Sequence, residues 1–367
     1  MSKPIRILHV VTTMNRGGIE TMLMNYYRNI DRTKIQFDFL EHRTEISDYD
    51  EEIQLLGGKI YRVSPLNPFS IKYRNELKKF FQSHDYKIVH SHLDCMSYIP
   101  LIYAKKAGIK VLIAHAHSTS QDKNLKFILK LLYKKKIKNV ATQLFACGND
   151  AGKWMFETNH FKVLRNAINT KDFVYNPLSS EKIKTQLGLT GKFVIGHVGR
   201  FTEAKNHNFI IEIMKEMIKI NPNAHLVLVG TGKLQPIIKE KVDKYGLNNY
   251  VTFLGKCSNV NQIMQAFDIF LFPSRYEGLG IAAIEAQASG LKCFISNKVP
   301  SECIVTNNVT ILSLDKTAQN WAEILNESVR FQRIDTSCQV KDSDFDIEKN
   351  AKWLEEFYKN EYRNYNK

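Results

Sequence analysis

Short apolar runs alternate with longer amphipathic segments along almost the whole chain, and this alternation limits the fold more than any other feature. Runs such as "IRILHVV" and "HLVLVG" have the length and the continuous apolar character of parallel strands that are buried on both faces. The segments between them are long enough to form covering helices. The pattern therefore predicts an α/β fold with doubly wound parallel sheets.

The strand candidates form two series separated by a polar stretch. The first series occupies residues 5–11, 37–41, 59–63, 87–92, 111–117 and 142–148, and the second occupies residues 192–199, 225–230, 251–255, 268–273 and 293–296. We place an interdomain linker near residues 170–185, which predicts domains over 1–175 and 185–340. A terminal helix over 346–367 is expected to pack back on the first domain. The 367 residues suffice for two substantial cores.

Charge and cysteine content restrict the partners and the compartment. The chain has 52 Lys and Arg against 37 Asp and Glu, a net charge of +15. Such a surface attracts polyanions, and charge alone does not choose among nucleic acid, nucleotides and anionic lipid. Six scattered cysteines favour free thiols in a reducing cytoplasm. No apolar run approaches the length of a membrane span, and the N-terminus lacks the apolar segment of a signal peptide, so we expect a cytoplasmic protein.

The stretch "PSRYEGLGIAAIEAQASG" (273–290) combines a glycine loop with the start of a helix. Gly278 and Gly280 would let the backbone approach a ligand, and the free N–H groups of the helix start suit a phosphate. Glu277 and Glu285 would repel a phosphate, so they more plausibly accept hydrogen bonds from hydroxyl groups on either side of it, as in a nucleotide sugar. The alternative is a solvated Glu277 and a Glu285 that only complements the helix dipole.

Two further loops in the second series carry glycines or cations. Arg200 and Lys205 follow a buried strand in "GRFTEAKNH" and could clamp a diphosphate, although an ordinary basic surface loop is the alternative. The "GTGK" segment is no phosphate-binding P-loop, because Leu234 stands where Ser or Thr is required. Gly230 and Gly232 are instead expected to form a turn beside the nucleotide.

The first series contains one glycine loop, "RGGIE", directly after its first strand. Gly17 and Gly18 open a helix there without the spacing of a dinucleotide site. Glu20 can be explained by its favourable place in the first helical turn.

Four histidines crowd the ends of two strands at positions 90, 92, 115 and 117. His-x-His on a strand places both rings on one face, as zinc ligands sometimes are. No Asp or Glu recurs nearby at ligand spacing, and packed core histidines remain the alternative. The D-x-D pairs 48/50, 342/344 and 344/346 lie in polar loops, and we attribute them to chance.

The loop "EGLGIAAIE" resembles the E-x7-E motif of the family 4 retaining glycosyltransferases. Four other stretches fit the same family in the same order: "TTMNRGGIE", "IAHAHST", "HVGRFTEAKNH" and "LVGTGKL". The resemblance therefore covers nearly the whole chain. It implies the GT-B architecture, in which two Rossmann-like domains face each other across a cleft, the first binding the acceptor and the second the nucleotide-sugar donor.

The resemblance also implies roles for single residues. Arg200 and Lys205 would contact the donor pyrophosphate and stabilise the leaving group, and Glu277 would hold the transferred sugar. His117 is the best match to the histidine at the donor sugar, with His115 as the other match. The expected donor-binding residues are Gly17, Gly18, Gly230, Gly232, Leu254, Lys256, Gly278, Leu279, Gly280 and Glu285. The family uses no metal and no cofactor besides its nucleotide-sugar substrate.

The segment 123–138 holds seven lysines and no acidic residue. On a helical wheel Lys123, Lys126, Lys130, Lys134 and Lys138 share one face, and Leu125, Ile128, Leu129 and Leu132 share the other. A core-facing helix with a solvated lysine face is one interpretation. We favour a helix on an anionic membrane surface, because the family attaches peripherally through its N-terminal domain and its acceptors are often lipid-linked.

Together these features predict a cytoplasmic, peripherally membrane-associated, metal-independent retaining glycosyltransferase. It would move a hexose, from a donor that we expect to be UDP-linked, to a glycan or lipid-linked acceptor in capsule or exopolysaccharide synthesis. Two alternatives remain. A sugar-nucleotide 2-epimerase shares the architecture but not the E-x7-E motif, and a nucleic-acid-binding protein would explain the charge but shows no recognition motif.

Overall fold

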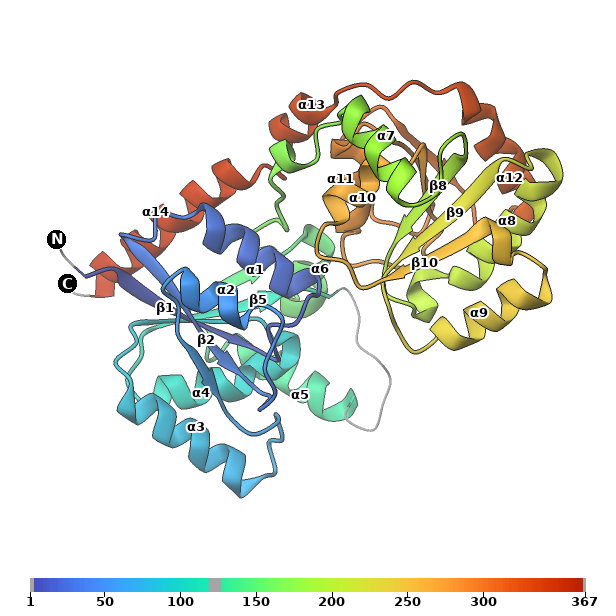
Figure 1. Cartoon of the computed structure of the whole chain (residues 1–367). Coiled ribbons are helices and arrows are strands. Elements are labelled where there is room, and N and C mark those ends of the chain that lie inside the picture. Colours follow the sequence, from blue (N-terminus) through green and yellow to red (C-terminus); the bar gives the residue numbers. More distant parts are fainter. Residues whose placement is uncertain (1–2, 119–126, 366–367) are drawn as a thin grey trace. The chain divides into compact units, whose positions relative to one another are not determined.

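The computed structural model describes residues 3–118 and 127–365. It consists of two compact units, the first comprising Met1–Ile168 and Phe345–Lys367 and the second Asn169–Asp344. Each unit is built on a parallel sheet (Figure 1).

The N-terminal unit contains a sheet in the order β3-β2-β1-β4-β5-β6-β7, with all neighbouring strands parallel. Its strands are β1 (Ile5–Val11), β2 (Ile35–Glu41), β3 (Ile60–Arg62), β4 (Ile88–Ser91), β5 (Val111–Ala116), β6 (Gln143–Ala146) and β7 (Lys162–Val163). The strand order reverses between β1 and β4. In doubly wound sheets this reversal, at the carboxyl ends of the strands, is where ligands bind.

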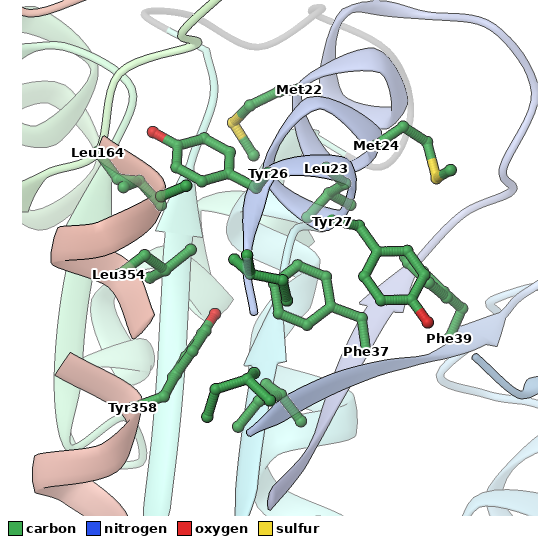
Figure 2. Close-up of a cluster of buried hydrophobic side chains, with 14 of the residues drawn as sticks. Met22, Leu23, Met24, Tyr26, Tyr27, Phe37, Phe39, Leu164, Leu354 and Tyr358 are labelled. Atoms are coloured by element: carbon green, nitrogen blue, oxygen red, sulfur yellow. The ribbon is translucent and has the colours of Figure 1, made fainter. Parts of the chain in front are cut away.

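One face of this sheet is covered by α1 (Gly18–Asn29) and by the terminal helix α14 (Ile347–Tyr365). Figure 2 shows Tyr26 from α1 and Leu354 and Tyr358 from α14 in one buried cluster with side chains of β2. The short helix α2 (Asp50–Leu55) adds Ile53 to the same cluster. The last helix of the chain therefore completes the core of the first unit.

The other face packs against α3 (Ile71–Ser83), α4 (Tyr98–Lys106), α5 (Phe127–Ile137) and α6 (Asn149–Phe156). On α5 the structure contradicts the helical-wheel assignment of the faces. Lys134 is buried, where its ammonium donates to Glu157 at 2.8 Å and lies 4.8 Å from the centre of the Trp154 ring. Ile128 and Leu132 are 74% and 51% exposed, which does not fit the alternative interpretation of a core-facing helix.

The remaining lysines of that segment fall into three groups. Lys130 is partly buried. Lys123 and Lys126 lie outside the described residues, and so does Leu125. Lys135, Lys136 and Lys138 are exposed around the apolar pair Ile128 and Leu132. The exposed surface of α5 is therefore an apolar strip bordered by lysines. Within residues 3–118 and 127–365 no helix is both long and apolar enough to cross a membrane.

The C-terminal unit repeats the doubly wound pattern with the strand order β10-β9-β8-β11-β12-β13. Its strands are β8 (Phe193–Val198), β9 (Ala224–Val229), β10 (Val251–Gly255), β11 (Ile269–Phe272), β12 (Lys292–Ser296) and β13 (Val309–Leu312), all parallel to their neighbours. Its helices are α7 (Pro177–Gln186), α8 (His207–Ile220), α9 (Gln235–Lys244), α10 (Val260–Gln265), α11 (Ile281–Ala288), α12 (Ala318–Asn326) and α13 (Ser337–Asp342). The order reverses between β8 and β11.

The predicted linker at 170–185 differs from what the structure contains there. The units divide at Ile168 and Asn169, and α7 occupies most of the polar stretch as part of the C-terminal unit. The helix begins because the Asn176 side chain accepts a hydrogen bond from the Ser179 N–H and Pro177 stands in the first turn. The chain returns to the first unit at Phe345, where the backbone N–H of Ile168 donates to the Phe345 carbonyl.

Candidate functional site

In the C-terminal unit, the loops that follow β8 and β11 flank the reversal of strand order. The first loop carries Arg200 and Lys205, and the second carries Glu277 and leads into α11. Both loops start at the carboxyl ends of adjacent strands, so the doubly wound topology alone brings the predicted cations and the predicted glutamate to one edge of the sheet.

A close ion pair joins the two loops. Lys205 Nζ donates to Glu277 Oε1 at 2.6 Å, and both side chains are largely buried. The Lys205 ammonium also lies 4.6 Å from the centre of the Phe272 ring, at the end of β11. A desolvated ammonium and carboxylate held in this way are costly to separate unless a new charged partner replaces each of them.

Arg200 lies in the same loop but is exposed. The backbone around it is fixed by hydrogen bonds from Gly199 N–H to the Val229 carbonyl and from Phe201 N–H to the Thr231 carbonyl. The Arg200 guanidinium is therefore open to solvent on a backbone that hydrogen bonds hold in place.

Gly230 and Gly232 lie where the loop after β9 contacts the loop that carries Arg200. A Cβ on Gly230 would come within 2.2 Å of the Gly199 carbonyl oxygen, and one on Gly232 within 2.4 Å of the Phe201 carbonyl oxygen. Gly230 also has φ of +130°, which side chains rarely allow. The two glycines thus let the loop after β9 press against the loop that carries Arg200.

The helix α11 starts at the end of the second loop. Gly280 caps it with φ of +89°, a left-handed conformation that favours glycine. Leu279 is buried, while Gly278 is exposed. No side chain caps the helix start, which leaves its N-terminal N–H groups oriented toward an incoming anion.

Glu285 lies in the second turn of α11. Burial raises its pKa to about 7 from its ordinary 4.5, and the nearby Lys205 opposes this rise. Lys205 therefore acts electrostatically on both glutamates of the E-x7-E motif. A carboxyl group with a pKa near 7 can accept hydrogen bonds from hydroxyl groups in its charged form and donate one in its neutral form.

The segment Leu254–Lys256 follows at the end of β10. Gly255 adopts a φ of +70°, and its carbonyl accepts a hydrogen bond from the Gly230 N–H at 2.7 Å. Leu254 is partly buried and Lys256 is exposed. The turn therefore adjoins the loop of Gly230, and it places backbone groups at the same edge of the sheet as Lys205 and Glu277.

In the N-terminal unit, Gly17 caps α1 and Gly18 is its first residue. A Cβ on Gly18 would meet nothing within 4 Å, so no neighbouring protein atom explains this glycine. The loop before it is anchored by a buried carboxylate: Glu41 accepts from the Met14 N–H at 2.6 Å and from the Ser47 hydroxyl at 2.9 Å. Glu41 also pairs with Arg62 at 3.2 Å.

Asp48 and Asp50, which form one of the D-x-D pairs, help to hold the same loop. Asp48 accepts from the backbone N–H of Arg16 at 2.8 Å, next to Gly17. Asp50 forms an ion pair with Arg62. The pair is thus explained by loop structure. Glu41, which no sequence pattern singled out, is the residue that joins these contacts to Met14.

Five histidines lie on the sheet face that packs against α1 and α14, one more than the sequence suggested. His9 of β1 joins His90, His92, His115 and His117. One hydrogen-bonded chain links His9, His92 and His117, with nitrogen separations of 3.0 Å at both contacts. A second chain links Tyr358, His90 and His115 at 2.7 and 3.2 Å. Burial lowers the pKa of all five, that of His117 to about 3, so they are neutral near pH 7.

Only His117 among the five is partly exposed. Its backbone N–H donates to Asp94 at 2.7 Å, and the Ser118 hydroxyl donates to the other oxygen of the same carboxylate at 3.0 Å. Asp94 has a φ of +46°, a left-handed conformation that non-glycine residues adopt at a cost. Sequence inspection missed Asp94, because its partners lie more than twenty residues further along the chain.

The predicted residues thus fall into two groups. Within the C-terminal unit, the ends of β8, β9, β10 and β11 gather Arg200, Lys205, Glu277 and the glycines at one sheet edge. Within the N-terminal unit, Gly17, Gly18 and His117 lie at the carboxyl ends of β1 and β5, with His115 buried behind His117.

Comparison with known proteins places the chain in a family. Residues 16–172 match the model described as Glycosyltransferase Family 4, and residues 179–335 match the model described as Glycosyl transferases group 1. The Bacillus subtilis (strain 168) protein named "Putative glycosyltransferase EpsF" is 38% identical over 333 residues, which cover 87% of this chain and 86% of that protein. The Staphylococcus aureus capsular polysaccharide biosynthesis glycosyltransferase CapH is 24% identical over 96% of this chain and 98% of its own length.

Solved structures support the fold. The Anabaena protein Alr3699/HepE, solved in complex with UDP and glucose, matches 97% of this chain and 99% of its own with a TM-score of 0.80 at 18% sequence identity. Sucrose-phosphate synthase from Thermosynechococcus elongatus matches with a TM-score of 0.78 at 17% identity. With its two parallel-sheet units, the chain has the predicted GT-B fold, and it belongs to the family 4 glycosyltransferases.

Proposed function

We propose that this glycosyltransferase transfers a hexose from a UDP-sugar to a glycan or lipid-linked acceptor during capsule or exopolysaccharide synthesis, with retention of the anomeric configuration. Similarity to CapH supports the pathway. An Escherichia coli relative, 27% identical over 63% of this chain, is named as a UDP-galactose-dependent galactosyltransferase acting on a diphosphoundecaprenol-linked sugar, which supports the donor and acceptor classes.

The observation that carries the proposal is the Lys205–Glu277 pair across the two loops at the strand reversal. A nucleotide sugar brings a diphosphate for the ammonium and hydroxyl groups for the carboxylate. The donor can therefore give each buried charge a new partner. No smaller ligand, such as free phosphate, would satisfy both.

In this mechanism the enzyme stabilises the departing diphosphate electrostatically. Lys205, the exposed Arg200 side chain and the N-terminal N–H groups of α11 would neutralise the charge that develops as the glycosidic bond breaks. Glu277 would hold the transferred sugar, Glu285 the ribose, and His117 would contact the donor sugar. We assign no carboxylate as a covalent nucleophile, which agrees with attack of the acceptor from the side that the diphosphate leaves.

A panel of nucleotide sugars tests the proposal. The purified protein is incubated with each donor, with and without lipid-linked acceptors, and the released nucleoside diphosphate is measured. We expect UDP release that depends on the acceptor, and a product whose anomeric configuration, determined by NMR, equals that of the donor. Release of UDP without any acceptor would instead support a 2-epimerase, and an inverted product would contradict retention.

We further propose that catalysis needs no divalent metal. The cations Arg200 and Lys205 would supply the charge that Mg²⁺ or Mn²⁺ supplies in metal-dependent transferases, and Asp48 and Asp50 are already engaged in holding a loop. Transfer should therefore persist in EDTA. Activity that disappears in EDTA and returns with Mn²⁺ would contradict this part of the proposal.

A membrane contact through α5 also remains a proposal, with its face revised. The exposed Ile128 and Leu132 would enter the lipid, and the lysines at 135, 136 and 138 would contact anionic headgroups. Burying each apolar side chain is worth about 1.5–3 kcal/mol and each lysine about 1 kcal/mol. Replacing Ile128 and Leu132 by Ser should abolish sedimentation with anionic vesicles. Ile237→Ser, at an exposed position of α9, is the control, and undiminished sedimentation of the double variant would refute the contact.

A further inference from the structure

The histidine cluster of the N-terminal unit has the composition of a transition-metal site. His92, His115 and His117 each offer one ring nitrogen, and these three nitrogens lie within 4.8 Å of one another. Three neutral imidazoles with an open fourth position are a common ligand set for zinc. We propose that these three histidines bind a divalent transition metal of the zinc class.

One of the three distances between ligand nitrogens is already close to that of a metal site. His92 Nδ1 and His117 Nε2 are 3.0 Å apart and share one hydrogen. Two ring nitrogens bound tetrahedrally to zinc at about 2.0–2.1 Å lie about 3.4 Å apart. Replacing the shared hydrogen by a metal therefore requires the two rings to separate by only about 0.4 Å.

The third ligand has a nitrogen without a partner. His115 Nε2 is buried and makes no hydrogen bond. A buried polar atom left unpaired costs free energy. Coordination would remove this cost, since the lone pair of His115 Nε2 would be donated to the metal.

A second layer of hydrogen bonds can hold two of the three ligands, His92 and His115, in the required tautomer. With the metal on His92 Nδ1, His92 Nε2 carries the hydrogen and donates to His9 Nδ1, which lies 3.0 Å away. With the metal on His115 Nε2, His115 Nδ1 donates to His90, which in turn donates to the Tyr358 hydroxyl. Each of these neutral rings keeps one hydrogen, which shifts where needed between the two nitrogens of the same ring, that of His9 included, so no net proton is released. Such outer partners orient metal-bound histidines.

The type of ligand favours one class of ion. Mg²⁺ and Mn²⁺ prefer oxygen ligands, whereas imidazole suits Zn²⁺, Co²⁺ and Ni²⁺. The alternative trio His9, His90 and His92 is fully buried, while the chosen trio reaches the surface through His117.

Occupation of this site has a consequence for catalysis, which rests on the proposed role of His117. A His117 ring that is bound to a metal through Nε2 cannot contact the donor sugar with that nitrogen. Zn²⁺ should therefore inhibit sugar transfer, while UDP, which carries no sugar, should still bind. A transferase that works in EDTA would thus be sensitive to zinc.

Metal binding is measured first, independently of activity. The full-length protein is stripped with a chelator and titrated with Co²⁺, whose visible absorption is much stronger in a four-coordinate nitrogen site than in water. We expect one Co²⁺ per chain, displaced by one Zn²⁺. His92→Gln and His117→Gln should weaken binding by more than about a hundredfold, and His9→Gln, an outer partner, by about ten- to a hundredfold. The exposed His160→Gln is the matched control and should bind normally.

The partly exposed position of His117 keeps the test valid if a core variant fails to fold. Absence of saturable Co²⁺ binding in the parent protein would overturn the site, and so would binding that survives in His117→Gln. Zinc binding without inhibition would overturn the inhibitory consequence. If zinc does not bind but His117→Gln lowers kcat, the metal site fails and the proposed function stands, so the two ideas fail separately.

Discussion

Replacing Glu285 by Gln tests whether the E-x7-E motif sacrifices stability for binding. Burial raises the pKa of the Glu285 carboxyl to about 7 from 4.5, against the opposing effect of Lys205. Glutamine keeps the shape and the hydrogen-bonding capacity of the side chain but carries no charge. The substitution therefore isolates the cost of holding an ionised carboxylate at this place in α11.

The sign of the effect follows from proton binding. Because the pKa is higher in the folded chain, the folded state holds more protons than the unfolded state between pH 4.5 and about 7. Stability must therefore fall as the pH rises through this window. The pKa difference corresponds to about 3 kcal/mol at most once the pH is well above 7. Since Gln does not ionise, Glu285→Gln should escape this loss and be the more stable protein near pH 8.

Urea denaturation near pH 5 and near pH 8 provides the assay. Trp321 is fully buried in the C-terminal unit, so its fluorescence reports the unfolding of that unit once Trp154 and Trp353 are replaced by Phe in every protein compared. Glu240→Gln, which removes an exposed carboxylate from α9, is the control. An equal pH dependence of unfolding in the parent and in Glu285→Gln would refute the reasoning.

Glu285→Gln should also bind UDP less tightly than the parent protein above pH 7. If ionised Glu285 accepts hydrogen bonds from the ribose, the affinity of the parent for UDP should exceed that of Glu285→Gln increasingly as the pH rises past 7. Calorimetry must compare the two proteins at each pH, because the terminal phosphate of the nucleotide itself ionises near pH 6. A difference in UDP affinity that stays constant across the pH range would contradict a contact between Glu285 and the ribose.

Three other substitutions probe the remaining contacts. Glu277→Gln should lower kcat by about ten- to a hundredfold, the value of one lost charge-assisted hydrogen bond, and leave the affinity for free UDP nearly unchanged; a large loss of UDP affinity in calorimetry would reverse the roles of Glu277 and Glu285. Lys205→Met should destabilise the ligand-free protein by about 3 kcal/mol, because it leaves the Glu277 carboxylate buried without its partner. In a Glu277→Gln background the same substitution should cost much less, which a double-mutant cycle of urea unfolding measures. Additive losses would mean that the two side chains are not coupled. Glu41→Gln should slow transfer, because it weakens the hydrogen bonds that hold the loop before Gly17. UDP binding to the C-terminal unit should be unchanged. Unaltered turnover would show that the loop keeps its position without this carboxylate.

Most strands could be predicted from sequence because parallel strands buried on both faces must be continuously apolar, as "FVIGHV" and "IFLF" are. The two-residue strand β7 carries no such run, and neither it nor the edge strand β13 is among the predicted strands. The polar composition of α7 predicts a linker and not a helix. The sequence nevertheless contains a helix start signal, because the N-cap residue Asn176 is followed by Pro177 in the first turn.

Side chains whose partners lie far along the chain could not be predicted. The helical wheel of α5 placed Lys134 in solvent because periodicity within one helix says nothing of Glu157 and Trp154, which give this lysine a buried partner. Glu41 and Asp94 escaped notice for the same reason. Each is recognised only through a backbone N–H from a distant loop, that of Met14 or of His117. Family motifs located the loops, but not the residues that hold them.

The Lys205–Glu277 pair also changes how the motif residues should be understood. Sequence comparison gives the two residues separate ligands, a diphosphate and a sugar, yet in the ligand-free protein each is the partner of the other. A buried ammonium waiting for a phosphate would be costly if it were alone, and so would a buried carboxylate waiting for a sugar. In the proposed function, pairing would remove both costs until the donor binds. A nucleotide sugar has both an anionic and a hydroxyl-bearing part, so it could give each buried charge a new partner at once.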